Sequence, residues 1–492
     1  MCLYLYIAYR TRMVCCFDNF IYLSVFCSSF LIFLASRHTF VSTNRLRMQK
    51  IKVFIIAAAV LLSGCASDES KIQTDAFSSG PFVKVEGTRF EIGGEPYYYV
   101  GANFWYGINL GSKGEGGNRE RLIRELDRME KIGITNLRIM GMSEGPDNEP
   151  YRMVPAVQKD KALFREELLE GLDFLLTEMG KRKIYAIVCL SNFWPWSGGF
   201  GQYVQWTRPQ DTIPYPPPHP NGSYDMYQKF VASFYTNKEA IALYNAALDK
   251  VLLRKNSITQ RFYKDDPTIM AWELCNEPRG VDNFEAYLKW IDSSARYIKS
   301  VAPNQLVTVG SEGETGSPEY SGTDFEKTHA FDHIDYTTVH IWIQNWDWYN
   351  PKKHTETFPN ASAKALDYLK RHAILAKKMN KPYVLEEFGI MKDQGSFDPN
   401  ASTKNRDVYY ELLFKEVYNY AKDSSMAAGV NFWAWGGEGR PRQMQGWWKP
   451  GDDFIGDPPH EEQGWYSVYD TDTSTNALIK KYADLMMQIG KK

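Results

Sequence analysis

Eight short apolar runs recur along the chain from residue 97 onward, and polar or amphipathic segments separate them. The runs span residues 97–105, 134–141, 184–193, 269–277, 306–312, 336–342, 383–389 and 429–435. Because each run is apolar throughout, both of its faces are expected to be covered, as they are in a parallel sheet. Short apolar runs that alternate with helical segments are typical of successive βα units.

Several of the segments between these runs have the spacing of amphipathic helices. Residues 118–132 place Leu122, Leu126 and Met129 on one helical face, and residues 164–179 show the same periodicity. Eight such units predict the α/β fold class, specifically a (β/α)8 TIM barrel with extended βα loops.

A short N-terminal β-hairpin is expected before the first barrel strand, at Phe82 to Ile92. Gly93 and Gly94 would turn the chain into that strand, so the hairpin is expected to plug the barrel bottom. Neither an internal repeat nor a second domain is visible, and residues 81–492 are predicted to form one domain.

The segment 48–65 has the order of a targeting signal. Lys50 and Lys52 precede an apolar run that ends in Leu62-Ser63-Gly64-Cys65. This arrangement resembles a bacterial lipoprotein signal peptide with its lipobox, and the resemblance implies that Cys65 becomes the lipidated first residue of the mature protein.

This reading makes Met48 the start of translation, residues 1–47 an overextended N-terminus, and the polar residues 66–80 a tether. A plain secretory signal and a short membrane anchor are alternatives, and the apolar residues 19–36 are near the minimum length for a membrane span. Under each alternative the domain is exported, so we expect a secreted or outer-membrane or cell-surface lipoprotein. The membrane would be contacted only through the lipid.

Composition narrows the range of partners. The chain has 57 Lys+Arg against 59 Asp+Glu and no basic tract, which argues against nucleic acid as a partner. It also has 14 Trp and 31 Tyr, more aromatic residues than a core needs, so some are expected to line a surface for a flat, partly apolar ligand. Sugars are one such ligand.

Cysteine usage and acidic tracts give no support for a metal or cofactor. Of the seven Cys, only Cys189 and Cys275 follow Cys65, and both are in apolar runs where a free thiol behaves as a small buried hydrophobe. No Cys/His pairs have the spacing of a zinc site, and the acidic tract 452–462 lacks the ordered ligand spacing of a calcium loop. We therefore expect no metal and no cofactor.

Two of the runs end in carboxylates. The fourth run ends in Asn-Glu-Pro at 276–278 and the seventh in Glu-Phe-Gly at 387–389. Because barrel strands present their carboxyl ends at one face, Glu277 and Glu387 are expected to flank one cleft. A single Glu is usually a solvated loop charge, but two at matching barrel positions are what glycosidic hydrolysis requires.

These motifs resemble glycoside hydrolase family 5, a family of retaining (β/α)8 enzymes. The resemblance implies that Glu277 is the acid/base and Glu387 the nucleophile. It also implies that four further residues bind substrate or tune the site: Asn276 beside the acid, and Arg138, His340 and Trp433 at other strand ends.

The resemblance extends to the endo-β-1,4-mannanase branch over roughly residues 82–485. It is carried by Leu-Ser-Asn-Phe-Trp at 190–194, by the Gly-rich segment 198–203, and by His-Ile-Trp at 340–342 ahead of Asn-Trp at 345–346. This implies a mannan endo-1,4-β-mannosidase whose substrate is mannan, galactomannan or glucomannan. We also expect a monomer. Trp194, Trp342 and Trp105 complete the predicted substrate-binding residues.

Rival functions remain open at this stage. An endoglucanase or an exo-acting mannosidase could use the same barrel, and a glycan-binding lipoprotein could keep the barrel without the chemistry. If the enzyme is retaining, the two carboxyls are expected about 5 to 5.5 Å apart. The pKa of Glu277 is expected to be raised by the ionised Glu387.

One departure from the family pattern concerns the sixth strand, where many members have His-x-Tyr and this chain has Trp342 in place of the Tyr. Either Trp342 lines the cleft there, or the phenol comes from elsewhere, with Tyr336 and Tyr349 nearby in the sequence. Glu386 is the rival of Glu387, and strand alternation is expected to turn the two to opposite faces.

Eight tryptophans at or after strand ends are candidates for stacking on sugar, and about half of them are expected to do so. They are Trp194, Trp196, Trp206, Trp346, Trp348, Trp447, Trp448 and Trp465. The proline-rich segment 206–235 is expected to wall one end of the cleft.

Overall fold

The computed structural model describes residues 80–424 and 426–491 of the chain. The predicted signal peptide, the lipidated Cys65 and the overextended N-terminus lie outside these described residues. Within them, no helix is both long enough and apolar enough to cross a membrane.

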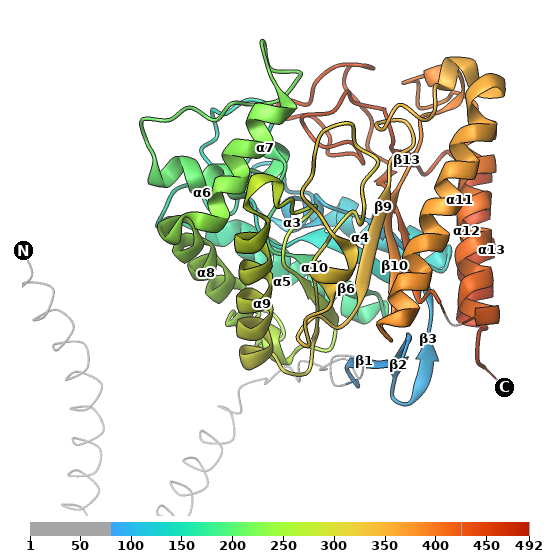
Figure 1. Cartoon of the computed structure of the whole chain (residues 1–492), viewed down its shortest axis with the longest axis horizontal. Helices are drawn as coiled ribbons and strands as arrows, with labels where there is room; N and C mark the ends of the chain where they lie inside the picture. The colour runs from blue at the N-terminus through green and yellow to red at the C-terminus, as the bar shows by residue number, and fades with distance from the viewer. Residues whose placement is uncertain (1–79, 425, 492) are drawn as a thin grey trace, which may run out of the picture. The chain divides into compact units, whose positions relative to one another are not determined.

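Eight parallel strands form the barrel, and all eight predicted strands are present (Figure 1). They are β4 (Tyr99–Asn103), β5 (Asn136–Met140), β6 (Tyr185–Cys189), β7 (Ile269–Glu273), β8 (Leu306–Thr308), β9 (Thr337–Ile341), β10 (Tyr383–Phe388) and β11 (Gly429–Phe432). The hydrogen-bonded order is β8-β7-β6-β5-β4-β11-β10-β9. Backbone bonds from Asp335 N to Val307 O (2.8 Å) and from His340 N to Glu312 O (3.1 Å) join the two ends of this order. The predicted TIM barrel is therefore confirmed.

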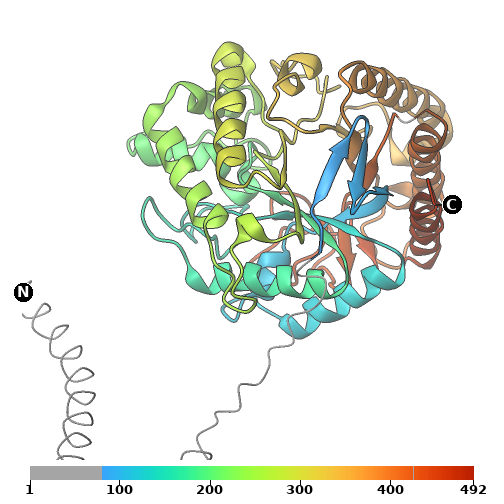
Figure 2. The ribbon, with the colours of Figure 1, turned by 90° about the horizontal axis from the view of Figure 1, so that it is seen from below.

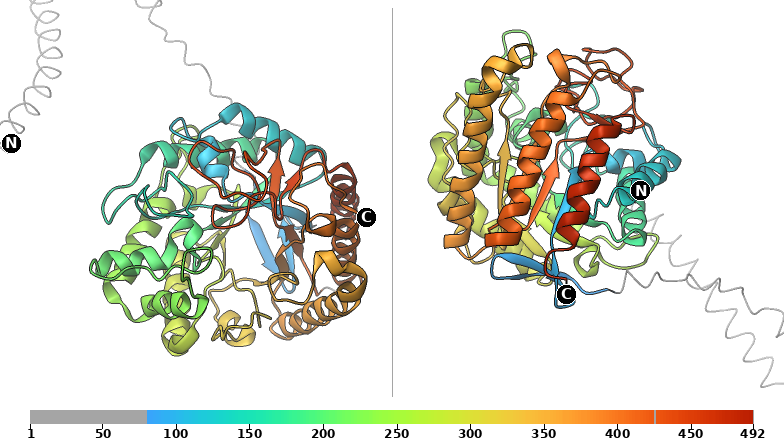
Figure 3. Two further views of the ribbon diagram at one scale, coloured as in Figure 1. Left: turned by 90° about the horizontal axis from the view of Figure 1, so that it is seen from above. Right: turned by 90° about the vertical axis from the view of Figure 1, so that its right-hand side faces the viewer.

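Helices surround the strands (Figures 1 and 3). They are α3 (Gly107–Gly111), α4 (Arg119–Lys131), α5 (Glu166–Lys181), α6 (Gly199–Thr207), α7 (Tyr224–Ala232), α8 (Lys238–Leu252), α9 (Phe284–Val301), α10 (Phe325–His329), α11 (His354–Lys378), α12 (Lys404–Asn419) and α13 (Thr473–Met487). In α4, the Asn118 side chain caps the first turn, and the predicted face of Leu122, Leu126 and Met129 is buried.

A small antiparallel sheet covers the bottom of the barrel (Figure 2). The predicted hairpin is present as β1 (Val83–Glu86) and β2 (Arg89–Ile92), but the turn after β2 leads into an unpredicted third strand, β3 (Glu95–Tyr97). Phe90 is fully buried and packs against Tyr99 and Tyr336 inside the barrel, with ring centroids 6.3 and 5.3 Å away. The hairpin thus plugs the bottom, as the sequence predicted.

The eighth predicted run is split in two. Its end forms β12 (Trp435–Gly437), which pairs with β13 (Val468–Tyr469) instead of continuing the barrel. The long loop between β12 and β13 lies over the top of the barrel, at the carboxyl ends of the strands (Figure 3, left). This loop helps to build the site described next.

Candidate active site

A cavity of about 370 Å³ lies where the barrel strands end. It is lined by Trp194, Trp196, Tyr224, Asn276, Glu277, Arg279, Glu312, Ser317, Pro318, Glu319, Trp342, Asn345, Trp346, Asp347, Glu387, Trp433, His460, Glu461 and Trp465. Carboxyl ends of strands and their loops are where TIM-barrel enzymes place their chemistry. Four of the eight tryptophans singled out in the sequence line this cavity.

Glu277 and Glu387 face each other in the cavity. Glu277 follows β7, Glu387 is on β10, and one side-chain oxygen of each lies within 4.8 Å of the other and of a His340 ring nitrogen. Such a separation falls on the retaining side of glycosidase geometry, since inverting pairs are about 6.5 to 9.5 Å apart. Glu277 also has a positive φ of 51°, a conformation that costs free energy and is concentrated at functional sites.

Arg138, at the end of β5, holds the Glu387 side of the site. Its guanidinium is 4% exposed and contacts Oε1 of Glu387 through Nη1. The same group donates to Glu273 Oε2 (2.7 Å), Asn276 Oδ1 (2.7 Å) and Asn103 Oδ1 (3.0 Å). A planar fork with several fixed partners can aim one nitrogen at a single carboxylate oxygen, which keeps Glu387 in place.

Three donors hold Glu277. His340 Nδ1 lies 2.6 Å from Glu277 Oε1, Trp342 Nε1 donates to the same oxygen at 3.3 Å, and Trp194 Nε1 donates to Oε2. His340 Nδ1 is also 3.3 Å from Glu387 Oε2, so one imidazole nitrogen contacts both carboxylates.

The pKa values of Glu277 and Glu387 are shifted differently from what the sequence predicted. Burial by itself raises the pKa of Glu277, but the hydrogen bond and charge of His340, the charge of Arg279 and the Trp194 donor together lower that pKa below its usual value. Burial raises the pKa of Glu387 to about 8, against the lowering effect of His340 and Arg138. The expected raised pKa of Glu277 is therefore wrong, because donors surround its anion.

The same geometry explains the departure on the sixth strand. Trp342 lines the cavity and donates to Glu277, whereas Tyr336 is buried in the lower barrel beside Phe90, and the Tyr349 hydroxyl meets His354 Nδ1 at 3.1 Å. Neither phenol takes the place of the missing strand-six Tyr.

Strand alternation predicted that Glu386 points to the outside of the barrel. In the structure it does not. The pairing of β10 with β9 is irregular between Leu385 and Glu387, and this bulge leaves both glutamates directed toward the barrel interior. Only Glu387 lines the cavity, while Glu386 is fully buried with Oε2 3.7 Å from Arg138 Nε. Glu273 has the buried, hydrogen-bonded position that its depth in the strand predicted.

The remaining predicted residues divide into two groups. Asn276, Trp194 and Trp433 line the cavity, and the amide of Asn276 bonds Asn192 Oδ1 at 3.0 Å. Trp105 does not line it, because its ring packs behind Trp196 at 5.6 Å and its Nε1 donates to Gly456 O at 2.9 Å.

Sequence reasoning missed several charged or titratable residues of the cavity, among them Arg279, Glu312, His460 and Glu461. Arg279 and Glu312 form a buried ion pair (2.7 Å), and the Arg279 guanidinium lies over the Trp194 ring at 4.9 Å. Arg279 lies two residues after a predicted strand and Glu312 is the last residue of another, and this position at a strand end is the signal that could have found them. His460 and Glu461 come from the loop between β12 and β13, whose place over the barrel no local pattern predicts.

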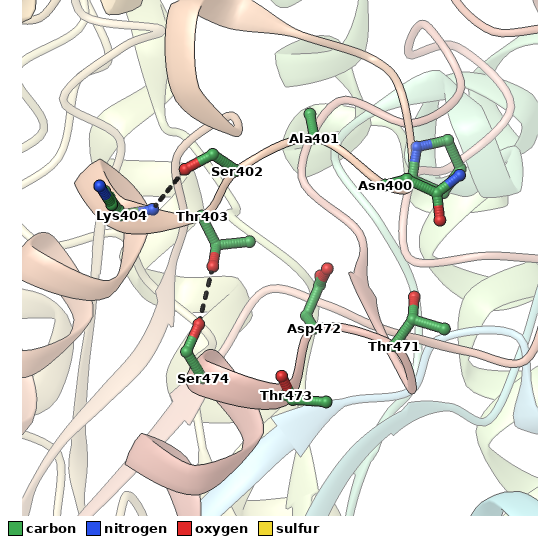
Figure 4. A pocket seen from close by; sticks show the side chains of 10 residues that line it. Asn400, Ala401, Ser402, Thr403, Lys404, Thr471, Asp472, Thr473 and Ser474 are labelled. Atoms are coloured by element: carbon green, nitrogen blue, oxygen red, sulfur yellow. Dashed lines mark hydrogen bonds between the residues drawn. The ribbon is translucent and has the colours of Figure 1, made fainter.

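A second pocket, of about 340 Å³, lies between residues 399–404 and 471–474 (Figure 4). Small hydroxyl side chains line it, and Thr403 and Ser474 bond each other at 3.0 Å. Its buried acid, Asp472, is paired with Lys392 and Arg406. Asp472 is the one carboxylate among the residues that line this pocket, so the pocket lacks the opposed pair of carboxylates found in the first cavity.

The proline-rich segment 206–235 was expected to wall one end of the cleft. It contributes one lining residue, Tyr224, to the first cavity.

Comparisons with known proteins point to one family. The sequence model described as GH family 5 beta-mannosidase-like matches residues 80–491. A putative mannan endo-1,4-beta-mannosidase 9 from Oryza sativa subsp. japonica is 32% identical over 396 residues, which cover 78% of this chain and 86% of that protein.

Solved structures agree with this family. A glycoside hydrolase family 5 mannosidase from Rhizomucor miehei is 39% identical with a TM-score of 0.77, and the match covers 83% of this chain and 98% of that one. A mutant of that mannosidase in complex with mannosyl-fructose is 38% identical, with the same TM-score and coverage.

Proposed function

The chain belongs to glycoside hydrolase family 5, and from this premise we propose that it hydrolyses β-1,4-mannosidic bonds of β-mannan with retention of configuration. The observation that carries the retaining mechanism is the opposed pair Glu277 and Glu387, whose oxygens lie within 4.8 Å. Retaining glycosidases need this short separation, because the second carboxylate must itself reach the anomeric carbon.

In the first step, the Glu387 carboxylate attacks the anomeric carbon while Glu277 gives a proton to the departing glycosidic oxygen. In the second step, Glu277 takes a proton from water, the water oxygen attacks the same carbon, and Glu387 leaves as a carboxylate. Arg138 keeps the attacking oxygen oriented, and Asn276 and Trp433 line the cavity where the reacting sugar would lie.

The acid step requires a proton on Glu277, although the donors and positive charges around it favour its anion. His340 offers a route, because its Nδ1 is in contact with both carboxylates. The imidazolium gives its Nδ1 proton to Glu277 and then takes the proton of Glu387. The result is an acid at Glu277 and a carboxylate at Glu387, with the charge of His340 restored.

The curated relatives are named as endo-acting enzymes, and endo action on mannan, galactomannan or glucomannan is the mode that we propose first. Product sizing from linear mannan, branched galactomannan and cellulose tests it. Endo action gives oligosaccharides of mixed length early in the reaction, and a preference for cellulose would overturn the mannan assignment. A reducing-sugar assay separates an enzyme from a glycan-binding protein. The wild type should release reducing sugar from mannan, and Glu387→Ala should release none.

One observation favours exo action as a second candidate. His460 Nδ1 and Glu461 Oε2 are inaccessible to solvent and have no hydrogen-bond partner in the described part of the chain, although both residues line the cavity. Hydroxyls at the end of a mannan chain would satisfy these atoms, and an otherwise unpaired buried polar group is costly. Release of mannose as the sole early product from mannohexaose would establish exo action in place of endo action.

We also propose that the enzyme is exported and held at the cell surface by a lipid on Cys65, with Met48 as its start. Support comes from the sequence alone, since these residues lie outside the described part of the chain. Labelling of the wild type but not of Cys65→Ala with radioactive palmitate would establish the anchor. Light scattering of the released domain tests the expected monomer.

A further inference from the structure

Glu386 is a buried carboxylate that the mechanism above does not use. It is fully buried on β10, one residue before Glu387, and neither of its oxygens has a hydrogen-bond partner among the described residues. Its Oε2 lies 3.6 Å from His340 Nε2 and 3.7 Å from Arg138 Nε, distances of ion pairs but not of hydrogen bonds.

The position of His340 makes this contact significant. Its ring is fully buried and Nδ1 faces the two catalytic carboxylates. Nε2 faces Glu386 and has no hydrogen-bond partner within residues 80–424 and 426–491. A carboxylate on each side of an imidazole favours the doubly protonated form, because both nitrogens then carry a proton toward an anion.

We propose that Glu386 is a positioning residue that holds His340 as an imidazolium before the reaction, so that its Nδ1 carries the proton that is passed to Glu277 and then replaced from Glu387. Glu386 would act through His340 and would not contact substrate, since it does not line the cavity. This inference rests on the proposed function.

The cost of keeping Glu386 supports a functional reason for it. A buried carboxylate without hydrogen bonds is expensive, and an apolar or amide side chain of similar size would suit a barrel interior better. The bulge between Leu385 and Glu387 turns this acid inward, where regular alternation would have directed it outward.

Other charged and titratable groups face this cluster from the neighbouring strands and their ends. They are Tyr99 from β4, Arg138 from β5, Glu273 and Glu277 from β7 and its end, Glu312 after β8, Tyr336 before β9 and Glu387 from β10. Burial lowers the pKa of His340, but the charge of Glu387, the hydrogen bond with Glu277 and the nearby Glu386 carboxylate together raise it to about 10.

Two measurements on Glu386→Gln test the proposal, with Glu386→Asp as the conservative variant. The first is the ring nitrogen NMR spectrum of His340, which needs no substrate. The wild-type ring should stay doubly protonated through neutral pH, and the Gln variant should lose a ring proton closer to the ordinary histidine pKa of about 6.5. The Asp variant, which keeps the charge, should restore the wild-type spectrum at least in part.

The second measurement is the pH profile of kcat/KM on an aryl β-mannoside. The alkaline limb of Glu386→Gln should move to lower pH by about one unit or more, because His340 then deprotonates in the working range. KM should stay unchanged while kcat falls. Asp173→Asn is the matched control, since Asp173 is also fully buried but is paired with Arg254 on the helical layer. Asp173→Asn should change the stability of the fold without moving the alkaline limb of kcat/KM.

A His340 ring that remains doubly protonated in Glu386→Gln, with an unmoved alkaline limb, overturns the proposal. If the wild type cleaves no mannoside, the proposed function fails, yet the NMR titration still decides whether Glu386 sets the charge of His340. The two failures are therefore distinguishable.

Discussion

Nδ1 of His340 lies 2.6 Å from Oε1 of Glu277 and so connects the sixth strand of the barrel to the end of the fourth. The same nitrogen is 3.3 Å from Glu387, which makes His340 the bridge between the two proposed catalytic carboxylates.

We predict that His340→Ala lowers kcat on mannan by about 100-fold or more, within the range of a lost general acid–base partner. Steady-state kinetics checks this, and His333→Ala serves as a control outside the cavity lining. A His340→Ala variant with near wild-type kcat would contradict the bridging role.

Replacement of the nucleophile should separate binding from turnover. Glu387→Ala removes the attacking oxygen but leaves the aromatic cavity lining, so hydrolysis should be abolished while mannan still binds. Calorimetry with mannohexaose measures the binding, and a reducing-sugar assay measures turnover. Substantial hydrolysis by this variant would remove Glu387 from the mechanism.

Replacement of the acid should depend on the substrate. Glu277→Ala should lose most activity on mannan, whose leaving group needs a proton, but keep the first step on aryl mannosides with very good leaving groups. A burst of the released phenol, measured in stopped flow, reports that step. Equal loss on both substrates would argue against the acid role of Glu277.

Glu144 offers a test of stability against pH. Its buried carboxylate accepts hydrogen bonds from Gly199 N (2.8 Å) and Tyr203 Oη (3.0 Å), yet burial raises its pKa from 4.5 to about 7. The folded protein thus binds this proton more tightly than the unfolded chain. Its contribution to stability is fully present below about pH 4.5 and is lost as the pH rises through 7.

The loss amounts to about 3 kcal/mol for a shift of this size. We expect Glu144→Gln, which cannot ionise, to remove this part of the pH dependence of unfolding free energy. Urea unfolding between pH 5 and 8 measures it, with Glu120→Gln at an exposed position of α4 as the control. Parallel pH curves for Glu144→Gln and wild type would show that Glu144 does not titrate in this range.

The sequence predicted the barrel and its two carboxylates because both depend on local signals. Continuous apolar runs mark buried parallel strands, and the motifs around Glu277 and Glu387 sit at the ends of such runs. The direction of Glu386 could not be predicted, since a bulge reverses the alternation on which the prediction relied. The pKa of Glu277 could not be predicted either, because Trp194 and His340, which lower it, are 83 and 63 residues away in sequence. The same is true of His460 and Glu461, which reach the cavity through a loop over the barrel.

The Trp194 donor gives a prediction with a defined sign. Its indole N–H bonds Oε2 of Glu277, and a hydrogen bond to the anion lowers the pKa of that carboxyl. Trp194→Phe keeps an aromatic ring in the cavity wall but removes the donor, so the pKa of Glu277 should rise. Because the acid step needs this proton, the alkaline limb of kcat/KM should move to higher pH, by about half a unit to one unit.

Trp465→Phe is the matched control for this variant. Trp465 lines the same cavity and stacks on Tyr466, with ring centroids 4.8 Å apart, whereas Trp194 and Trp342 supply the indole donors to Glu277. Its replacement should change KM without moving the alkaline limb. A limb that moves equally in both variants would mean that loss of ring area, and not loss of the donor, changes the ionisation of Glu277. A limb that moves only in Trp194→Phe, and upward, would establish that the indole N–H sets the acidity of the proposed acid/base.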